Sequence, residues 1–216
     1  MCFSAQASFI ASVILVLIGI ITLKINSDNR YKALSLMPFL FGIQQFFEGV
    51  LWISFNSNGL PFVHELSKYI FLVFAILIWP FYVPQTMLLA EEKGNNLKKK
   101  VLTNLRNFSV LWVTLAAVYM VVHTPSASAA TSHIAYTVPI TGFLSALAVG
   151  TYLLLTITPF FISSNIKIKL FGVLFSLTAI LSYRYYSAYF TSVWCYFAAV
   201  VSSLSLLLIW SENRDE

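Results

Sequence analysis

Seven long runs of apolar residues constrain the fold of this chain more than any other feature. They span residues of about 4–23, 34–55, 69–90, 107–123, 139–163, 169–186 and 189–210. A helix needs about 20 apolar residues to cross the hydrocarbon core of a bilayer. Of the 216 residues, 59% are hydrophobic and only 10% are charged, against about 25% charged in a soluble domain. The sequence therefore predicts an all-α integral membrane protein, a seven-transmembrane-helix bundle that forms a single domain over residues 1–216.

The distribution of basic residues predicts the orientation of these helices. Lys and Arg are retained on the cytoplasmic side of a membrane. Of the 13 Lys and Arg residues, all but Lys68 and Arg184 lie on one predicted side. The residues on that side are Lys24, Arg30, Lys32, Lys93, Lys98, Lys99, Lys100, Arg106, Lys167, Lys169 and Arg214. The split predicts that the N-terminus is outside and the C-terminus is cytoplasmic. The net charge of +5 is thereby explained by topology, and we expect a lipid bilayer as partner but no nucleic acid.

Polar residues inside the apolar runs are the first candidates for a functional site. An ionisable group near the bilayer centre costs at least about 2.5–3.5 kcal/mol, so it marks a functional site by default. Glu48 is the one acid well inside a run. At 3.6 residues per turn, Gln44, Glu48 and Trp52 share one helix face, and Gln45 flanks them. Two amides, a carboxyl and an indole should therefore face the interior of the bundle.

Two interpretations of this strip stay open. In the functional one, Glu48 lines an outward-facing polar pocket as a proton carrier, cation ligand or general base. In the structural one, a protonated or paired Glu48 fixes the packing of two helices. The carboxyl should lie in the outer half of the bundle, roughly 10 Å from the end of its helix. Gly42 and Gly49 should let a neighbouring helix approach closely.

Other polar residues fall at the same predicted depth. Arg184 could be the cationic partner of Glu48, or its side chain could extend to the lipid headgroups instead. His133 lies in the uncharged segment 124–138, which we expect to form an outer loop. The predicted ligand-binding residues are therefore Glu48, Gln44, Gln45, Trp52, Arg184 and His133.

The two cysteines, Cys2 and Cys195, leave three interpretations open. They could form a disulfide in an oxidising compartment, act as weak metal ligands together with His133, or merely pack as small side chains. Two thiols cannot make a four-thiolate site, and no regular ligand spacing surrounds them. We therefore expect no metal and no cofactor.

Several sequence patches carry a resemblance to a family. The chain opens with Met1-Cys2-Phe3-Ser4-Ala5, and it contains Gln-Gln…Glu-Gly from Gln44 to Gly49, Trp79-Pro80 and Ser-Val-Trp-Cys at 192–195. In these patches it resembles an uncharacterised family of small bacterial membrane proteins that open with Met-Cys-Phe-Ser-Ala. The resemblance implies a multi-pass protein of the bacterial inner membrane, and it implies no chemistry.

These observations lead to a functional expectation with two alternatives. The first is a non-catalytic membrane protein that binds or moves a small solute, ion or lipid through a polar pocket around Glu48. The second is a membrane-embedded enzyme or a redox or metal protein that uses Cys2, Cys195 and His133. The third is an accessory subunit with no site of its own. Whether the protein is an enzyme stays open at this level, although the absence of known catalytic motifs favours a non-enzyme.

Overall fold

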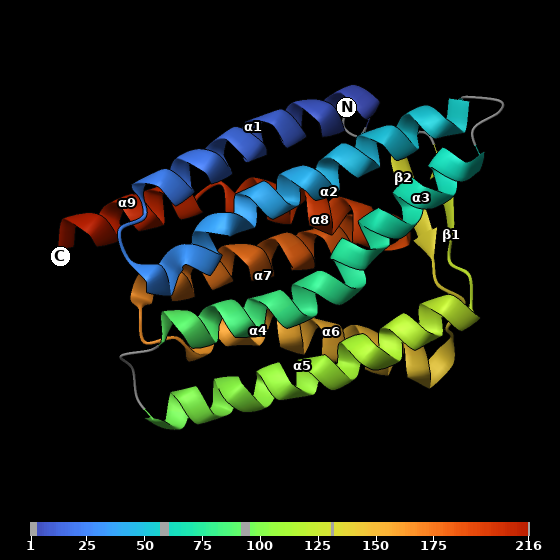
Figure 1. Ribbon diagram of the computed structural model, residues 1–216. Helices are drawn as coiled ribbons and strands as arrows, with labels where there is room; N and C mark the ends of the chain where they lie inside the picture. Colours follow the sequence, from blue (N-terminus) through green and yellow to red (C-terminus); the bar gives the residue numbers. More distant parts are fainter. Residues whose placement is uncertain (1–3, 57–60, 92–95, 131, 216) are drawn as a thin grey trace.

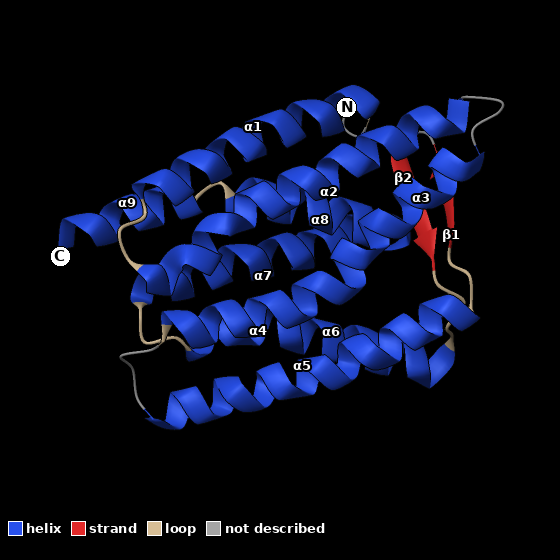
Figure 2. Cartoon of the chain, viewed as in Figure 1, coloured by secondary structure: helices blue, strands red, loops and turns tan. Residues whose placement is uncertain are grey.

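The computed structural model describes residues 4–56, 61–91, 96–130 and 132–215, and nearly all of them are helical (Figures 1 and 2). The α-helices are α1 (Ala5–Ile25), α2 (Lys32–Asn56), α3 (Pro61–Leu72), α4 (Trp79–Ala90), α5 (Asn96–Val122), α6 (Gly142–Ile162), α7 (Ile166–Tyr186), α8 (Phe190–Ser202) and α9 (Ser205–Asp215). The shorter elements are the 3-10 helices η1 (Asn29–Tyr31) and η3 (Ser187–Tyr189), the π-helical segment η2 (Val73–Ile78), and the strands β1 (Ser126–Ala130) and β2 (His133–Thr137).

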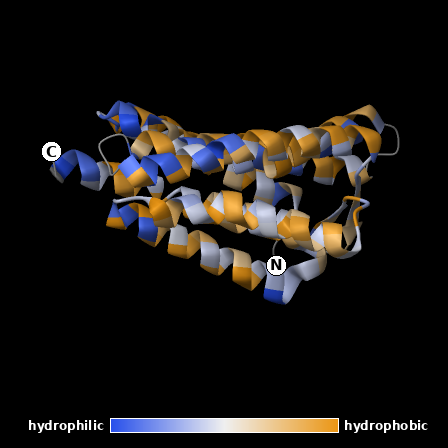
Figure 3. Ribbon diagram, turned by 90° about the horizontal axis from the view of Figure 1, so that it is seen from below, coloured by the Kyte–Doolittle hydropathy of each residue, from blue (hydrophilic) through white to orange (hydrophobic). Residues whose placement is uncertain are grey.

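The helices run roughly side by side, so the bundle has two ends (Figure 1). The C-terminal end holds α9, the start of α2, the end of α4 and the α6–α7 turn. The hairpin end holds the two strands and the start of α3. Hydrophilic residues gather mainly at the C-terminal end (Figure 3). The described members of the larger basic group follow this pattern, since Lys24 ends α1, Lys98 to Lys100 lie in the first turns of α5, and Arg214 ends α9.

Six helical stretches are long and apolar enough to cross a membrane. They are Ala5–Ile25, Asn29–Phe55, Pro61–Ala90, Asn96–Val122, Gly142–Ile162 and Ile166–Arg214. The last of these contains α7, η3, α8 and α9, and α7 packs against α8 because the chain turns back at η3. Large apolar side chains such as Leu115 and Phe143 are 60% and 80% exposed. Such broad apolar exposure is unusual for a soluble monomer and suits a lipid environment.

A β-hairpin stands where the sequence predicted only a loop. Strands β1 and β2 pair antiparallel from Ser126 opposite Thr137 to Ala130 opposite His133. Ile134 and Tyr136 lie two residues apart on β2, so their side chains point to the same face of the hairpin. This face is directed inward, because Ile134 is fully buried and the Tyr136 hydroxyl is buried. Strand β2 packs on α8, and β1 contacts α2. The hairpin thus covers one end of the α2–α8 interface.

Glycines let α1 and α2 approach closely, as the sequence predicted for Gly42 and Gly49. A Cβ at Gly42 would lie 2.7 Å from Val16 Cγ2 and 3.0 Å from its backbone nitrogen. A Cβ at Gly49 would lie 2.8 Å from the Phe9 ring. Since real Cβ atoms do not approach other atoms so closely, this interface depends on glycine having no side chain at these two positions.

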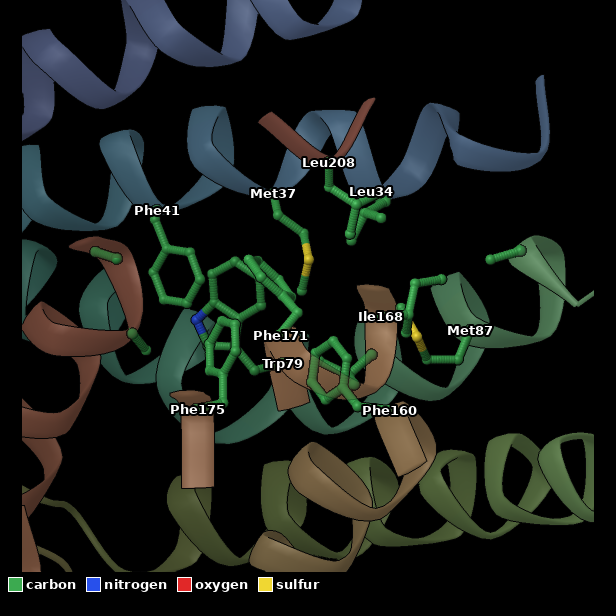
Figure 4. Close-up of a cluster of buried hydrophobic side chains, with 14 of the residues drawn as sticks. Leu34, Met37, Phe41, Trp79, Met87, Phe160, Ile168, Phe171, Phe175 and Leu208 are labelled. Carbon is green, nitrogen blue, oxygen red and sulfur yellow. The ribbon is translucent and has the colours of Figure 1, made fainter. Parts of the chain in front are cut away.

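The main apolar core lies between the middle of the bundle and its C-terminal end (Figure 4). The core side chains labelled in Figure 4 are Leu34, Met37 and Phe41 from α2, Trp79 and Met87 from α4, Phe160 from α6, Ile168, Phe171 and Phe175 from α7, and Leu208 from α9. Phe160 stacks on Phe175 with ring centroids 5.2 Å apart. This dense packing separates the polar groups at the two ends of the bundle.

Candidate functional site

Glu48 projects from α2 toward α8 and is only 1% exposed. Its Oε1 atom accepts a hydrogen bond of 2.6 Å from the Ser192 hydroxyl of α8. Its Oε2 atom is buried and has no hydrogen-bond partner among the described residues. No basic side chain in the described part of the chain forms an ion pair with this carboxyl. A buried carboxyl with so little compensation is costly when it is ionised.

Gln44 lies one turn away on the same face of α2 and is bound by α4. Its Oε1 atom accepts a hydrogen bond of 2.7 Å from Trp79 Nε1. The Trp79 ring also stacks on Phe41, with centroids 3.8 Å apart. Trp79 directly follows the π-helical segment η2, and its backbone N–H bonds to the carbonyl of Phe74. Because Pro80 has no N–H to donate, the regular helix ladder is interrupted at this point.

Gln45 and Cys195 complete the buried group. Gln45 is fully buried beside the Glu48 carboxyl, yet neither its Oε1 nor its Nε2 has a partner in good hydrogen-bond geometry among the described residues. Cys195 lies one turn after Ser192 on α8, faces Gln44 and has a buried sulfur atom. We call Glu48, Gln44, Gln45, Ser192 and Cys195 the Glu48 cluster.

Tyr136 of strand β2 covers the Glu48 cluster from the hairpin end. Its ring stacks on Phe71 of α3, with centroids 4.6 Å apart and planes 6° from parallel. Its hydroxyl is buried, has no partner in the described residues and lies within electrostatic reach of Glu48 and Cys195. Tyr136 was not among the predicted site residues, because nothing in its sequence surroundings shows that a hairpin would fold back over α2 and α8.

The other three predicted binding residues lie outside the Glu48 cluster. Arg184 is exposed, and its guanidinium lies 5.8 Å from the centre of the Tyr185 ring. Trp52 is half-buried and makes an edge contact with Phe55, 6.3 Å between centroids. His133 is half-buried, 5.0 Å from the ring centres of Tyr186 and of Tyr189. The structure therefore brings together Glu48, Gln44 and Gln45, and among the described residues no hydrogen bond or ion pair links Arg184 or Trp52 to the carboxyl.

Of the two cysteines, only Cys195 lies in the described residues. Cys2 lies outside the described residues, so its pairing with Cys195 stays a prediction. Within the described ranges, no group of three or more His, Cys, Asp or Glu side chains is arranged to hold a metal ion. Burial lowers the pKa of His133, which keeps its ring neutral near pH 7.

A small cavity of about 20 Å³ adjoins the Glu48 cluster at Cys195. Its walls are mainly aromatic and aliphatic side chains, among them Phe41, Trp79 and Trp194. A cavity of this volume has room for about one water-sized molecule. Glu48 is not among the residues that line it. The carboxyl is thus enclosed by side chains, and the arrangement is a closed polar cluster rather than an open pocket.

A second buried carboxylate lies at the C-terminal end and was missed by the sequence reasoning. Glu91 follows α4 and is 3% exposed. Its Oε2 atom accepts hydrogen bonds from the Ser164 backbone nitrogen at 2.8 Å and from the Ser163 hydroxyl at 3.2 Å. Glu91 looks like part of a polar connecting segment in the sequence, so only the folded α6–α7 turn reveals its burial.

Further polar contacts tie the same turn to other helices. Tyr31 donates a hydrogen bond of 3.0 Å to Glu212 of α9 and accepts one of 3.2 Å from Asn165. Glu212 also pairs with Lys167 at 2.9 Å. In contrast to Glu48, these carboxylates have cationic or backbone donors. Glu212 is thus compensated by a cation, and Glu91 is held at Oε2 by two donors, whereas its Oε1 atom is buried and has no partner among the described residues.

The length, hydropathy and helical content of this chain are those of a multi-pass membrane protein. Its bundle encloses a buried polar cluster. The model of a family of unknown function (DUF6629) matches residues 1–216, and the chain belongs to that family. No curated protein and no solved structure matches the chain. The family assignment supplies no activity, so function has to be argued from the Glu48 cluster.

Proposed function

We propose that this chain is a seven-span inner-membrane protein that binds a small cationic solute or ion at Glu48 and moves it across the membrane in exchange for a proton. The observation that carries the proposal is the state of the Glu48 carboxyl. It is 1% exposed, is held by one serine hydroxyl and has no basic partner among the described residues. A positively charged ligand or a proton would supply the missing compensation.

The seven-span count rests on the length of the last helical stretch. Ile166–Arg214 has 49 residues, and at 1.5 Å per residue a straight helix of that length would measure about 73 Å. The hydrocarbon core is about 30 Å thick. Since α7 packs against α8 after the turn at η3, this stretch supplies two spans. The other five stretches supply one each.

The proposed orientation rests on the two ends of the bundle. The basic residues around α1, α2, α5, α7 and α9 gather at the C-terminal end. That end is cytoplasmic by the rule for positive charge, so the N-terminus and the hairpin face outward. Glu48 lies eight residues before the last residue of α2, Asn56, or about 12 Å along the axis. The Glu48 cluster then lies in the outer half, beneath the hairpin.

Transport by proteoliposomes tests the function. Vesicles with the full-length protein and an entrapped pH indicator are given inward gradients of Na⁺, K⁺ or NH₄⁺ in turn. We expect at least one gradient to change internal pH faster than in empty vesicles. Glu48→Gln should slow this change at least about tenfold, because a loss of about 1.4 kcal/mol of binding is tenfold in affinity.

The matched control is Glu91→Gln, which neutralises the other deeply buried carboxylate while its serine donors remain. It should keep most of the wild-type rate. The proposal is wrong if no gradient moves internal pH faster than in empty vesicles, or if Glu48→Gln transports as fast as wild type. The alternative of an enzyme or a redox or metal protein that uses Cys2, Cys195 and His133 involves a residue outside the described ranges, and no observation in the described residues favours it.

A further inference from the structure

Three buried oxygens without hydrogen-bond partners among the described residues are associated with Glu48. They are Oε2 of Glu48, Oε1 of Gln45 and the hydroxyl of Tyr136. Glu48 and Gln45 are 1% and 0% exposed, and Gln45 lies beside the Glu48 carboxyl. A buried polar atom without a partner costs about 1–3 kcal/mol. The Tyr136 hydroxyl lies within electrostatic reach of Glu48, and the amide nitrogens of Gln44 and Gln45 also have no partners among the described residues. A ligand that contacts oxygen directly would compensate the three oxygens.

Charge balance restricts the ligand of these oxygens. The Glu48 cluster holds one carboxyl, and among the described residues no basic side chain pairs with it. A monovalent cation would neutralise this carboxylate, whereas a divalent cation would leave an uncompensated positive charge in a buried site. The described residues also contain no group of three His, Cys, Asp or Glu side chains that would suit a transition metal.

Space restricts the ligand further. Glu48 does not line the cavity of about 20 Å³, which adjoins Cys195 and has mainly apolar walls. The Glu48 carboxyl is 1% exposed, so a cation that reaches it has to exchange its water shell for the surrounding oxygens. Carboxylate, amide and hydroxyl oxygens are the ligands that hard cations prefer. The side chains have to separate to admit any ion, and they have to separate less for dehydrated Na⁺ than for the larger K⁺.

We infer that Glu48, Gln45 and Tyr136 bind Na⁺, and that a proton competes with Na⁺ for the Glu48 carboxylate. This inference rests on the proposed function and specifies its ligand. With Na⁺ bound, Glu48 is ionised and its Oε2, Gln45 Oε1 and the Tyr136 hydroxyl contact the ion. With a proton on Oε2 instead, the carboxyl donates a hydrogen bond to Gln45 Oε1. Each state compensates the carboxyl, so one leaves as the other arrives.

Equilibrium unfolding of the full-length protein tests the inference without any transport. The thermal midpoint is measured in lipid nanodiscs as NaCl replaces choline chloride at constant ionic strength. A ligand that binds only the folded state raises stability by RT ln(1 + [L]/Kd). We expect the midpoint to rise with Na⁺ at about pH 8 and not with K⁺. At about pH 6, proton competition should raise the Na⁺ concentration needed for the same shift, by up to about tenfold per pH unit.

Two variants and two controls locate the effect. Glu48→Gln should abolish the Na⁺ shift, and Tyr136→Phe should raise the required Na⁺ concentration about tenfold, because it removes one ligand worth about 1.4 kcal/mol. Glu91→Gln should retain the shift. Tyr119→Phe removes a hydroxyl that bonds to the Pro139 carbonyl and should also retain it. If Glu48→Gln does not fold, Tyr136→Phe alone still decides the question.

The inference is overturned if NaCl and KCl shift the midpoint equally, or if the Na⁺ shift is unchanged in both Glu48→Gln and Tyr136→Phe. Its failure differs from failure of the proposed function. A Glu48-dependent pH change driven by K⁺ or NH₄⁺ in proteoliposomes would keep the function and replace Na⁺ by another cation. Na⁺ binding without any transport would keep the site and remove the transport function.

Discussion

At the residue scale, two buried glutamates of the same chain differ in the donors that hold them. Glu91 receives a backbone N–H and a serine hydroxyl on one oxygen. Glu48 receives only one serine hydroxyl. In both residues the second oxygen is buried and has no partner in the described residues. Hydrogen bonds to charged groups contribute about 1.5–3 kcal/mol each. The difference explains why we assign binding to Glu48 and a structural role to Glu91.

The hydroxyl of Ser192 provides a sharp test at this scale. Ser192→Ala removes the donor to the Glu48 carboxyl, so we expect the free energy of unfolding to fall by about 1–3 kcal/mol. Ser202→Ala is the matched control, since Ser202 is equally buried on α8 but bonds to the Ala199 carbonyl of its own helix. Denaturant unfolding in detergent measures both variants. Equal losses for the two would contradict a special role for the Ser192–Glu48 bond.

At the element scale, the hairpin and the π-helical segment position Tyr136 and Trp79 against the Glu48 cluster, and neither element is apparent from the apolar runs. The hairpin brings Tyr136 over the interface of α2 and α8, and a two-stranded hairpin needs such packing because it is marginal alone. The segment η2 precedes Trp79, whose indole bonds to Gln44. Irregular helical turns of this kind often lie at functional sites. Each element therefore places one side chain in contact with the region of the Glu48 cluster.

Glycine substitutions test the packing of these elements. A Cβ at Gly19 of α1 would lie 2.6 Å from the backbone nitrogen and the Cβ of Phe39. We therefore expect Gly19→Ala to lower the free energy of unfolding by about 1–3 kcal/mol. A Cβ at Gly150 of α6 would have no described atom within 4 Å, so Gly150→Ala should be neutral or stabilising by up to about 1 kcal/mol. Denaturant unfolding in detergent measures both changes, and similar effects would contradict the close α1–α2 contact.

Much of the helical architecture is predictable from the sequence because apolar runs and helix geometry are local properties. The burial of Glu48 and the close approach at Gly42 and Gly49 follow from the same reasoning. The Trp79–Gln44 bond, the position of Tyr136 and the burial of Glu91 do not. Each depends on segments distant in the sequence, and no spacing between residues encodes which helix a side chain will meet. For the same reason, the sequence alone allows Arg184 as a partner of Glu48.

At the scale of the whole molecule, polar groups are separated into two regions. The Glu48 cluster lies toward the hairpin end, and the network of Glu91, Tyr31 and Glu212 lies at the C-terminal end. Between them pack apolar side chains such as Phe160, which is fully buried (Figure 4). In this conformation the aromatic core closes the path from Glu48 to the basic end. Access to the carboxyl is therefore shorter from beneath the hairpin, and the proposed transport would require the core to open.

The central claim is that Glu48 is an exchangeable carboxyl inside the membrane rather than a permanently fixed packing group. Infrared difference spectra of the protein in lipid, recorded as the pH is raised, test it most directly. We predict a protonated carboxyl band that disappears on raising the pH, is absent from Glu48→Gln and persists in Glu91→Gln. A difference spectrum that is identical for wild type and Glu48→Gln across the whole pH range would contradict the claim.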